Sequence, residues 1–148
     1  MAEVRSAEVT WSGDLASGSG TVDYVSSGAF ARLPVSWAAR TEAHNGKTSP
    51  EEFLAAAHAS CFSMALSSGL AKAGTPPRQL KVTANVTFDK TDAGWGVKSS
   101  ELVVRGVVPG ATPESFRAAA DAAKDGCPIS RALKGNVELS VDATLESA

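Results

Sequence analysis

The two cysteines, Cys61 and Cys127, are the residues whose chemistry is most informative in this chain. A thiolate is a nucleophile, a metal ligand and a partner for disulfide formation. Cys127 directly precedes Pro128 at an expected helix start, where free N–H groups and the helix dipole favour an anion, so by itself it is the more acidic candidate. Cys61 lies in an apolar segment, and apolar burial suppresses thiolate formation. Its sequence context therefore favours an inert packed thiol unless a cation from elsewhere activates it.

A metal site would be a different use of the same residues. His44 and His58 could join the two cysteines as a Cys₂His₂ set, and His58 lies one helical turn before Cys61. However, structural zinc sites normally show closely spaced C-x₂-C or H-x₃-H pairs, and this chain has neither. We therefore expect no metal site and no cofactor, and we expect His58 to be a hydrogen-bonded residue packed among the helices.

The bulk properties are those of an ordinary cytoplasmic domain. The chain has 148 residues and a net charge of −2, with no repeats and no linker, so we expect one domain over 1–148. The absence of a basic surface argues against a nucleic-acid partner. No uninterrupted apolar run is long enough to span a bilayer, and the first ten residues do not resemble a signal peptide. Two cysteines 66 positions apart are not a secreted disulfide framework, so we expect a cytoplasmic location and no membrane partner.

A long helix over 50–72 is the central expected element. Ser49 can cap its N-terminus, Pro50 suits the first helical position, and Glu52 completes a capping box. The residues that follow are apolar on almost every side, which is typical of a buried helix. At about 1.5 Å per residue the helix is about 34 Å long, so one chain has difficulty covering it. Either both sheets of one chain wrap it or a partner subunit does, and the second arrangement is favoured.

The remaining patterns predict strands on both sides of this helix and two further helices. Alternating apolar and polar residues indicate strands over 79–89 and 97–108, which the turn at 92–94 should join as a hairpin. Further extended segments are expected over 4–11, 21–25, 33–37 and 137–145, and helices over 112–126 and 127–135. These elements predict an α+β fold with about six strands whose sheets have one polar face.

Two motifs resemble one family closely. The segment TSPEEFLAAAHASCFSMALS is followed, 66 residues after its cysteine, by GCPISRALKG. This pair strongly resembles the osmotically inducible protein C (OsmC) and organic hydroperoxide resistance (Ohr) family, and the likeness covers nearly the whole chain. The resemblance implies an OsmC-like fold in which antiparallel sheets wrap around a long buried central helix. It also implies an intertwined homodimer with active sites at the subunit interface.

The resemblance also implies a role for four residues. Cys61 matches the attacking cysteine, Cys127 the resolving cysteine, and Glu51 the active-site glutamate of the family. In the Ohr branch an arginine lies in the N-terminal Gly-rich loop, but residues 12–20 contain none. In the OsmC branch the arginine lies just before the long helix, where this chain has Arg40. The match therefore favours the OsmC branch and makes Arg40 the expected activating cation.

The activity that the resemblance implies is a thiol-dependent peroxidase. Organic hydroperoxides would be reduced to alcohols through a Cys61 sulfenic acid and an intrachain disulfide with Cys127, which an external dithiol of the lipoyl type would reduce. Arg40 would stabilise the Cys61 thiolate, and Glu51 would orient the Arg40 guanidinium by a two-point carboxylate contact. Apolar side chains near Cys61 in the sequence would contact the alkyl group of the substrate: Trp37, Phe53, Phe62 and Met64.

Two alternatives remain open from the sequence. A non-catalytic member of the same fold would bind small molecules or sense oxidants, and its cysteines would be oxidised once without turnover. A structural protein would carry Cys61 as an inert buried thiol, which would react slowly with thiol reagents.

Overall fold

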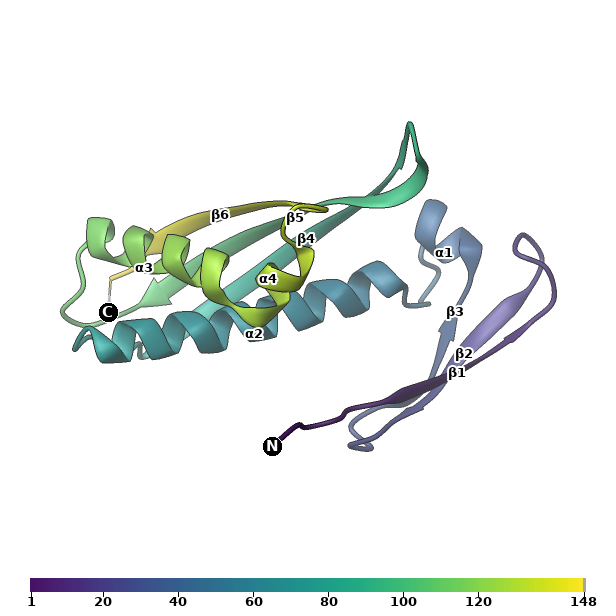
Figure 1. Cartoon of the computed structure of the whole chain (residues 1–148), viewed down its shortest axis with the longest axis horizontal. Coiled ribbons are helices and arrows are strands. Elements are labelled where there is room, and N and C mark those ends of the chain that lie inside the picture. The colour runs from purple at the N-terminus through teal and green to yellow at the C-terminus, as the bar shows by residue number, and fades with distance from the viewer. Residues whose placement is uncertain (148) are drawn as a thin grey trace. The chain divides into compact units, whose positions relative to one another are not determined.

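The computed structural model describes residues 1–147, which form two compact units, Met1–Phe53 and Leu54 onward. The predicted α+β class is confirmed, whereas the prediction of a single domain stays a prediction. Along the chain the elements are β1 (Ala7–Ser12), β2 (Ser19–Val25), β3 (Ala31–Val35), α1 (Trp37–Thr41), α2 (Pro50–Lys72), β4 (Gln79–Thr91), β5 (Gly94–Val107), α3 (Pro113–Gly126), α4 (Pro128–Leu133) and β6 (Glu138–Leu145) (Figure 1).

The first unit contains an antiparallel sheet in the order β1-β2-β3, followed by the short helix α1. The prediction that the third extended segment runs to Trp37 is wrong at its end, because β3 stops at Val35 and Trp37 begins α1. The reason is local. The Ser36 hydroxyl accepts a hydrogen bond from the Ala39 N–H at 3.2 Å, which caps a helix at this point.

The start of α2 follows the predicted capping pattern. The Ser49 hydroxyl accepts a hydrogen bond from the Glu52 N–H at 3.2 Å, and Pro50 is the first helical residue. The Thr48 hydroxyl donates to the Glu52 carboxylate at 2.9 Å, which fixes the side chain against the entering loop. The helix ends at Lys72, so its predicted bounds are confirmed.

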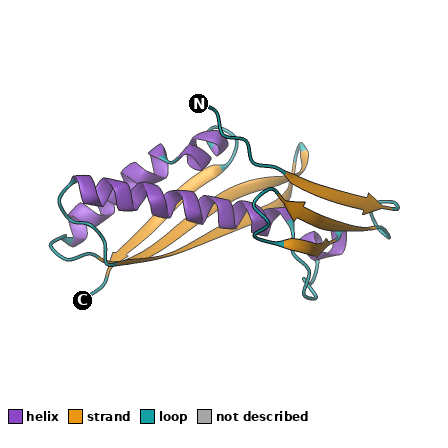
Figure 2. Ribbon diagram, turned by 90° about the horizontal axis from the view of Figure 1, so that it is seen from below, coloured by secondary structure: helices purple, strands orange, loops and turns teal. Residues whose placement is uncertain are grey.

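The second unit packs helices on one face of the sheet β4-β5-β6, as Figures 1 and 2 show. The predicted hairpin is confirmed, because β4 and β5 pair antiparallel along their whole length. Inward-facing residues of α2, α3, β5 and β6, with the residues directly after β5 and α3, form the core: Phe62, Leu66, Leu70, Leu102, Val104, Val108, Phe116, Ala120, Ala123, Cys127 and Ala143. Along each strand, residues that pack against this core alternate with exposed residues. The face of the sheet away from the helices is therefore the polar one.

The last strand departs from the predicted antiparallel arrangement. β6 pairs with β5 in parallel, from Ser99 opposite Glu138 to Gly106 opposite Leu145. The reason is the connection, which runs from β5 through α3 and α4 before it returns to the sheet. A helical crossover of this length joins parallel strands, whereas antiparallel neighbours need only a short turn.

Within one chain, α2 buries a single stripe. Residues at four-residue spacing face the core: His58, Phe62, Leu66 and Leu70. On the other side Ala56, Ala57 and Met64 are exposed, Met64 to 72%. By length and composition, α2 is long and apolar enough to cross a membrane. The core helix of a globular protein often has the same length and composition. The second unit by itself therefore leaves an apolar face of α2 uncovered.

Candidate active site

The two cysteines come together in the second unit, one from each of two helices. Cys61 lies on α2 and is partly buried, whereas Cys127 ends α3 and is fully buried. Cys127 also caps α4, because its sulfur accepts a hydrogen bond from the Ser130 N–H at 3.3 Å. Both residues are free thiols. The predicted place of Cys127 at a helix start is therefore confirmed.

The surroundings of Cys61 oppose ionisation. Burial raises the pKa of the Cys61 thiol, and a hydrogen bond to the Cys127 side chain and the charge of that sulfur raise the pKa further. A hydrogen bond from the Ile129 backbone, at the start of α4, acts in the opposite direction. The net direction is upward, so the Cys61 thiol of this chain by itself is protonated near neutral pH. An attacking thiolate at this position needs a cation, as the sequence suggested.

Arg40 and Glu51 form the other predicted pair, in the first unit. Arg40 Nη2 donates to Glu51 Oε1 at 2.7 Å and Arg40 Nε donates to Oε2 at 3.2 Å, which is the expected two-point contact. Arg40 is in the last turn of α1 and Glu51 is in the first turn of α2, where the helix dipole favours a carboxylate. The guanidinium lies 5.6 Å from the centre of the Trp37 ring, within the range of a cation–π contact. The Arg40 side chain keeps 27% of its surface exposed, against 10% for Glu51.

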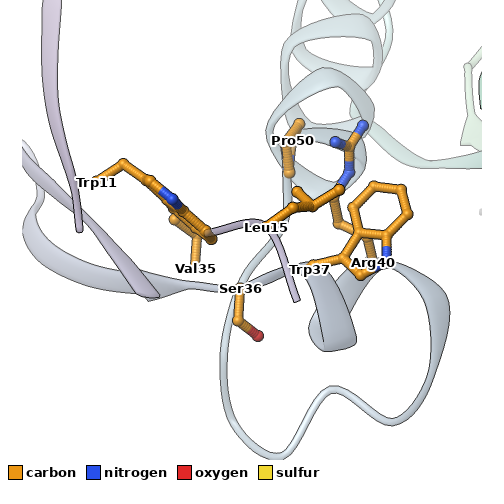
Figure 3. A pocket seen from close by; sticks show the side chains of 7 residues that line it. All are labelled: Trp11, Leu15, Val35, Ser36, Trp37, Arg40 and Pro50. Atoms are coloured by element: carbon orange, nitrogen blue, oxygen red, sulfur yellow. The ribbon is translucent and has the colours of Figure 1, made fainter. Parts of the chain in front are cut away.

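An apolar cavity of about 380 Å³ lies beside this pair (Figure 3). Its walls come from β1, the loop after it, the end of β3, α1 and the start of α2: Trp11, Leu15, Val35, Ser36, Trp37, Arg40 and Pro50. Gly20 lets the Trp11 ring lie against β2, because a Cβ there would meet the ring at 2.7 Å. The cavity is therefore an apolar space with one cationic side chain in its wall.

The sequence predicted only part of this lining. Of the four apolar residues expected near the substrate, Trp37 lines the cavity. Phe62 belongs to the core of the second unit, Phe53 stacks on Phe30 at 5.7 Å, and Met64 is exposed. Sequence reasoning missed Trp11 and Leu15, whose only signal was their position beside the Gly-rich turn after β1.

His58 is fully buried and hydrogen-bonded at both ring nitrogens, as predicted. Nδ1 lies 2.6 Å from Ser100 Oγ on β5, and Nε2 lies 2.8 Å from Ser130 Oγ on α4. Burial lowers the pKa of His58, so the ring is neutral near pH 7. His44 is exposed on the loop before α2. Within residues 1–147, no three His, Cys, Asp or Glu side chains are grouped as metal ligands.

The fold and site define a class of α+β proteins with two interacting thiols. One thiol lies on the long central helix, and the other lies at the N-terminus of a short helix. A family model described as OsmC-like protein matches residues 43–142. The chain is 40% identical over 143 residues to peroxiredoxin OsmC of Escherichia coli (strain K12), and the aligned region covers 97% of each chain. This chain belongs to the OsmC-like family.

Two further comparisons concern the Ohr side of the family. Organic hydroperoxide resistance protein OhrA of Bacillus subtilis (strain 168) is 33% identical over 96 residues, 64% of this chain and 66% of the relative. The crystal structure of organic hydroperoxide resistance protein OhrB of Bacillus subtilis superposes with a TM-score of 0.72 at 26% identity. It covers 94% of this chain and 98% of the other. The fold is therefore the one that OsmC and Ohr proteins share.

Proposed function

We propose that this chain is a two-cysteine peroxidase that reduces organic hydroperoxides to alcohols. The observation that carries the proposal is the pair of free, interacting thiols, Cys61 on α2 and Cys127 at the start of α4. Relatives named peroxiredoxin and organic hydroperoxide resistance protein support a peroxidase-type role. The thiol pair supports the two-cysteine route, because the Cys61 and Cys127 side chains are hydrogen-bonded to one another.

The first step is nucleophilic attack by the Cys61 thiolate on the terminal oxygen of the hydroperoxide. The S–O bond forms as the O–O bond breaks, the sulfur is oxidised to a sulfenic acid, and the alkoxide leaves with both bonding electrons. The alkoxide then takes up a proton and becomes the alcohol. Cys61 is partly buried, and this limits access of further peroxide to the sulfenic acid.

The second step converts the sulfenic acid to a disulfide, which a reductant then restores to two thiols. The Cys127 sulfur attacks the Cys61 sulfenic acid, which forms an intrachain disulfide and releases water. An external dithiol then reduces the disulfide by two thiol exchanges, and a lipoyl-type dithiol is the proposed class. Because Cys127 is fully buried, exchange by an outside thiol has to begin at the more accessible Cys61.

Arg40 is the proposed cation that activates Cys61, with Glu51 holding its guanidinium. The same helix carries Glu51 and Cys61, but ten residues of α-helix separate them by about 15 Å along the axis. The two-point contact ties Arg40 to Glu51. We therefore assign the Arg40–Glu51 pair that serves a given Cys61 to a second copy of the chain.

A homodimer also accounts for the uncovered side of α2. Ala56, Ala57 and Met64 form an exposed apolar face on the helix that carries Cys61. A second copy that packs on this face would bury it and close the site from water. Interfaces that complete a core in this way often bury 2,000 Å² or more in total, so the dimer should persist at micromolar concentration.

The cavity beside Arg40 is the proposed site for the organic part of the substrate. Trp11, Leu15 and Trp37 supply apolar walls, and Arg40 supplies the charge that a developing alkoxide needs. Alkyl and aryl hydroperoxides should therefore react faster than hydrogen peroxide, which gains nothing from the apolar walls.

A steady-state assay tests the function directly. With dihydrolipoamide as donor, cumene hydroperoxide should support many turnovers, whereas hydrogen peroxide should be a poor substrate. A protein that consumes one equivalent of peroxide and then stops would be a sensor instead. Equal efficiency on both peroxides would remove the proposed alkyl site while leaving the thiol chemistry intact.

A further inference from the structure

A chain of hydrogen bonds leads from the sulfur of Cys127 into the interior of the second unit. Cys127 Sγ donates to Ser130 Oγ at 3.1 Å, and Ser130 Oγ lies 2.8 Å from His58 Nε2. His58 Nδ1 lies 2.6 Å from Ser100 Oγ. All four side chains are essentially inaccessible to solvent, and they come from α2, β5 and the start of α4.

One tautomer of His58 joins these hydrogen bonds into a continuous path for a proton. Ser130 Oγ accepts from Cys127, and its own hydroxyl proton can be donated to His58 Nε2 when that nitrogen is unprotonated. In the same tautomer the ring proton is on Nδ1, which can donate to Ser100 Oγ. This tautomer presents a vacant basic nitrogen to the hydroxyl that accepts from the Cys127 thiol.

We propose that Ser130 and His58 form a proton relay that deprotonates Cys127 when it attacks the oxidised Cys61. This inference rests on the two-cysteine cycle proposed above and assigns that cycle two further residues. Ser130 touches the reacting sulfur and is a catalytic residue in this step. His58 acts through Ser130 and is a positioning residue that also accepts the proton.

The atoms and electrons of the step balance. As the Cys127 sulfur attacks, its proton passes to Ser130 Oγ and the Ser130 hydroxyl proton passes to His58 Nε2. The S–S bond forms, the S–O bond of Cys61 breaks, and hydroxide leaves, to be neutralised by the proton that the relay took from Cys127. Cys127 is oxidised and Cys61 is reduced by the same electron pair. The imidazolium returns this proton through water, so the net product is one water molecule.

A small cavity adjoins the relay at Ser130. This cavity of about 160 Å³ has Ser130 in its wall together with Gly135, Val137 and Leu139, and the charged side chains Lys124, Asp125 and Lys134 complete it. A space of this size holds several water molecules. A buried imidazolium is unfavourable in an apolar interior, so the proton stays on His58 only briefly and leaves through this cavity.

A single-turnover experiment with the full-length protein tests the relay. Reduced protein is mixed with one equivalent of cumene hydroperoxide between pH 6 and 9.5. A sulfenic-acid trap reports Cys61 oxidation, and the mass of the alkylated protein reports the disulfide. Ser130→Ala removes the link, whereas His58→Gln keeps a hydrogen-bond acceptor but cannot take up a proton. Ser63→Ala, which removes a hydroxyl bonded to the Ala59 carbonyl on α2, is the matched control.

Oxidation of Cys61 should occur at the wild-type rate in all variants. Disulfide formation at pH 7 should slow by about 10- to 100-fold in Ser130→Ala and His58→Gln and stay unchanged in Ser63→Ala. The two slow variants should approach the wild-type rate at high pH, because hydroxide then removes the thiol proton without the relay. A purely structural role would not give this recovery.

Three outcomes would overturn the relay. Unchanged disulfide rates in both variants would show that the hydrogen bonds carry no proton, and equal slowing at every pH would show that they only position the sulfur. If His58→Gln does not fold, Ser130→Ala alone decides between these results. If the wild-type protein oxidises Cys61 but forms no disulfide, the two-cysteine cycle itself fails together with the relay.

Discussion

The two predicted halves of the site differ in their surroundings. The cysteine pair lies in the second unit among apolar and hydroxyl side chains, where burial raises the pKa of Cys61. The Arg40–Glu51 pair lies in the first unit at the edge of an apolar cavity and is partly exposed. The first region would protect a sulfenic acid but disfavours the thiolate, and the second has a positioned cation without a nucleophile. Each region therefore lacks what the other has.

The cysteine region is tested most strongly by removing each sulfur in turn. Cys61→Ser should abolish peroxidase activity, because the remaining thiol, Cys127, is fully buried and does not meet the peroxide. Cys127→Ser should leave the first attack intact and let Cys61 proceed to sulfinic acid, since the resolving sulfur is missing. Mass spectrometry after peroxide treatment distinguishes the two, and in the wild type it should show a Cys61–Cys127 disulfide. A Cys127 that remains open to alkylation after one equivalent of peroxide would contradict the pairing.

The charged region is tested by removing its cation. Arg40→Met removes the proposed cation that offsets burial, so it should raise the pKa of Cys61 and slow peroxide attack at pH 7 by about 100-fold or more. The rate of Cys61 alkylation against pH measures this directly, and the curve should move to higher pH. Arg40→Lys, which keeps the charge but loses the planar two-point contact, should fall between the variant and the wild type. Coincident curves for wild type and Arg40→Met would transfer the role to Arg32 or Arg131.

Glu51→Gln should act in the same direction with a smaller effect. It loosens the guanidinium without removing the positive charge, so a loss of about tenfold in the rate of attack is expected. The exposed neighbour Glu52→Gln is the matched control, because its carboxylate bonds Thr48 and not Arg40. An equal loss in both variants would point to an effect on the start of α2 instead.

The apolar cavity should affect the preference between substrates and not the rate of the thiol chemistry itself. Contact worth about 1–3 kcal/mol should give cumene hydroperoxide a 10- to 200-fold advantage in kcat/KM over hydrogen peroxide. Leu15→Ala and Trp11→Ala should reduce that advantage and leave turnover of hydrogen peroxide unchanged. A parallel loss on both substrates would show that these side chains support the fold of the first unit and do not contact the alkyl group.

The smallest expected effect concerns the stability of the cysteine region in acid. Burial lowers the pKa of His58 in the folded chain, whereas the unfolded chain takes up the proton below about pH 6.5. The unfolded state then binds more protons, so the free energy of unfolding should fall with decreasing pH by at most about 1.4 kcal/mol per unit. Urea unfolding between pH 7 and 5 at fixed protein concentration should show this slope. His58→Gln should flatten it, and the exposed His44→Gln should not.

Local patterns in the sequence predicted most of the elements. The Ser49 cap, the alternation along β4 and β5, and the start of α3 at Pro113 are all short-range signals, and the structure has each of them. The signal that Ser36 gave is also local, but the regular alternation up to Trp37 concealed it. The parallel pairing of β6 could not be deduced from the strand itself, because its direction depends on the crossover through α3 and α4.

The candidate site could be predicted where its residues belong to a sequence motif, and not where tertiary packing brings residues together. The two cysteines, Glu51 and Arg40 were each tied to a motif, and the Arg40–Glu51 contact is the one expected. Ser100 gave no signal, because it meets His58 only through a contact across 42 positions of sequence. The cavity wall likewise joins Trp11 to Pro50 by tertiary packing, which nearness in sequence to Cys61 could not indicate.

The central claim, that the charged pair of one copy activates the cysteine of another, is tested most directly by mixing two inactive chains. Arg40→Met and Cys61→Ser chains, co-expressed with different tags, can be purified as the mixed dimer. Its Arg40→Met chain supplies Cys61 and its Cys61→Ser chain supplies Arg40. We expect one complete site per mixed dimer, and so about half of the wild-type activity. Activity no higher than that of the two parent variants would contradict the account, because it would show that each site draws all four residues from a single chain.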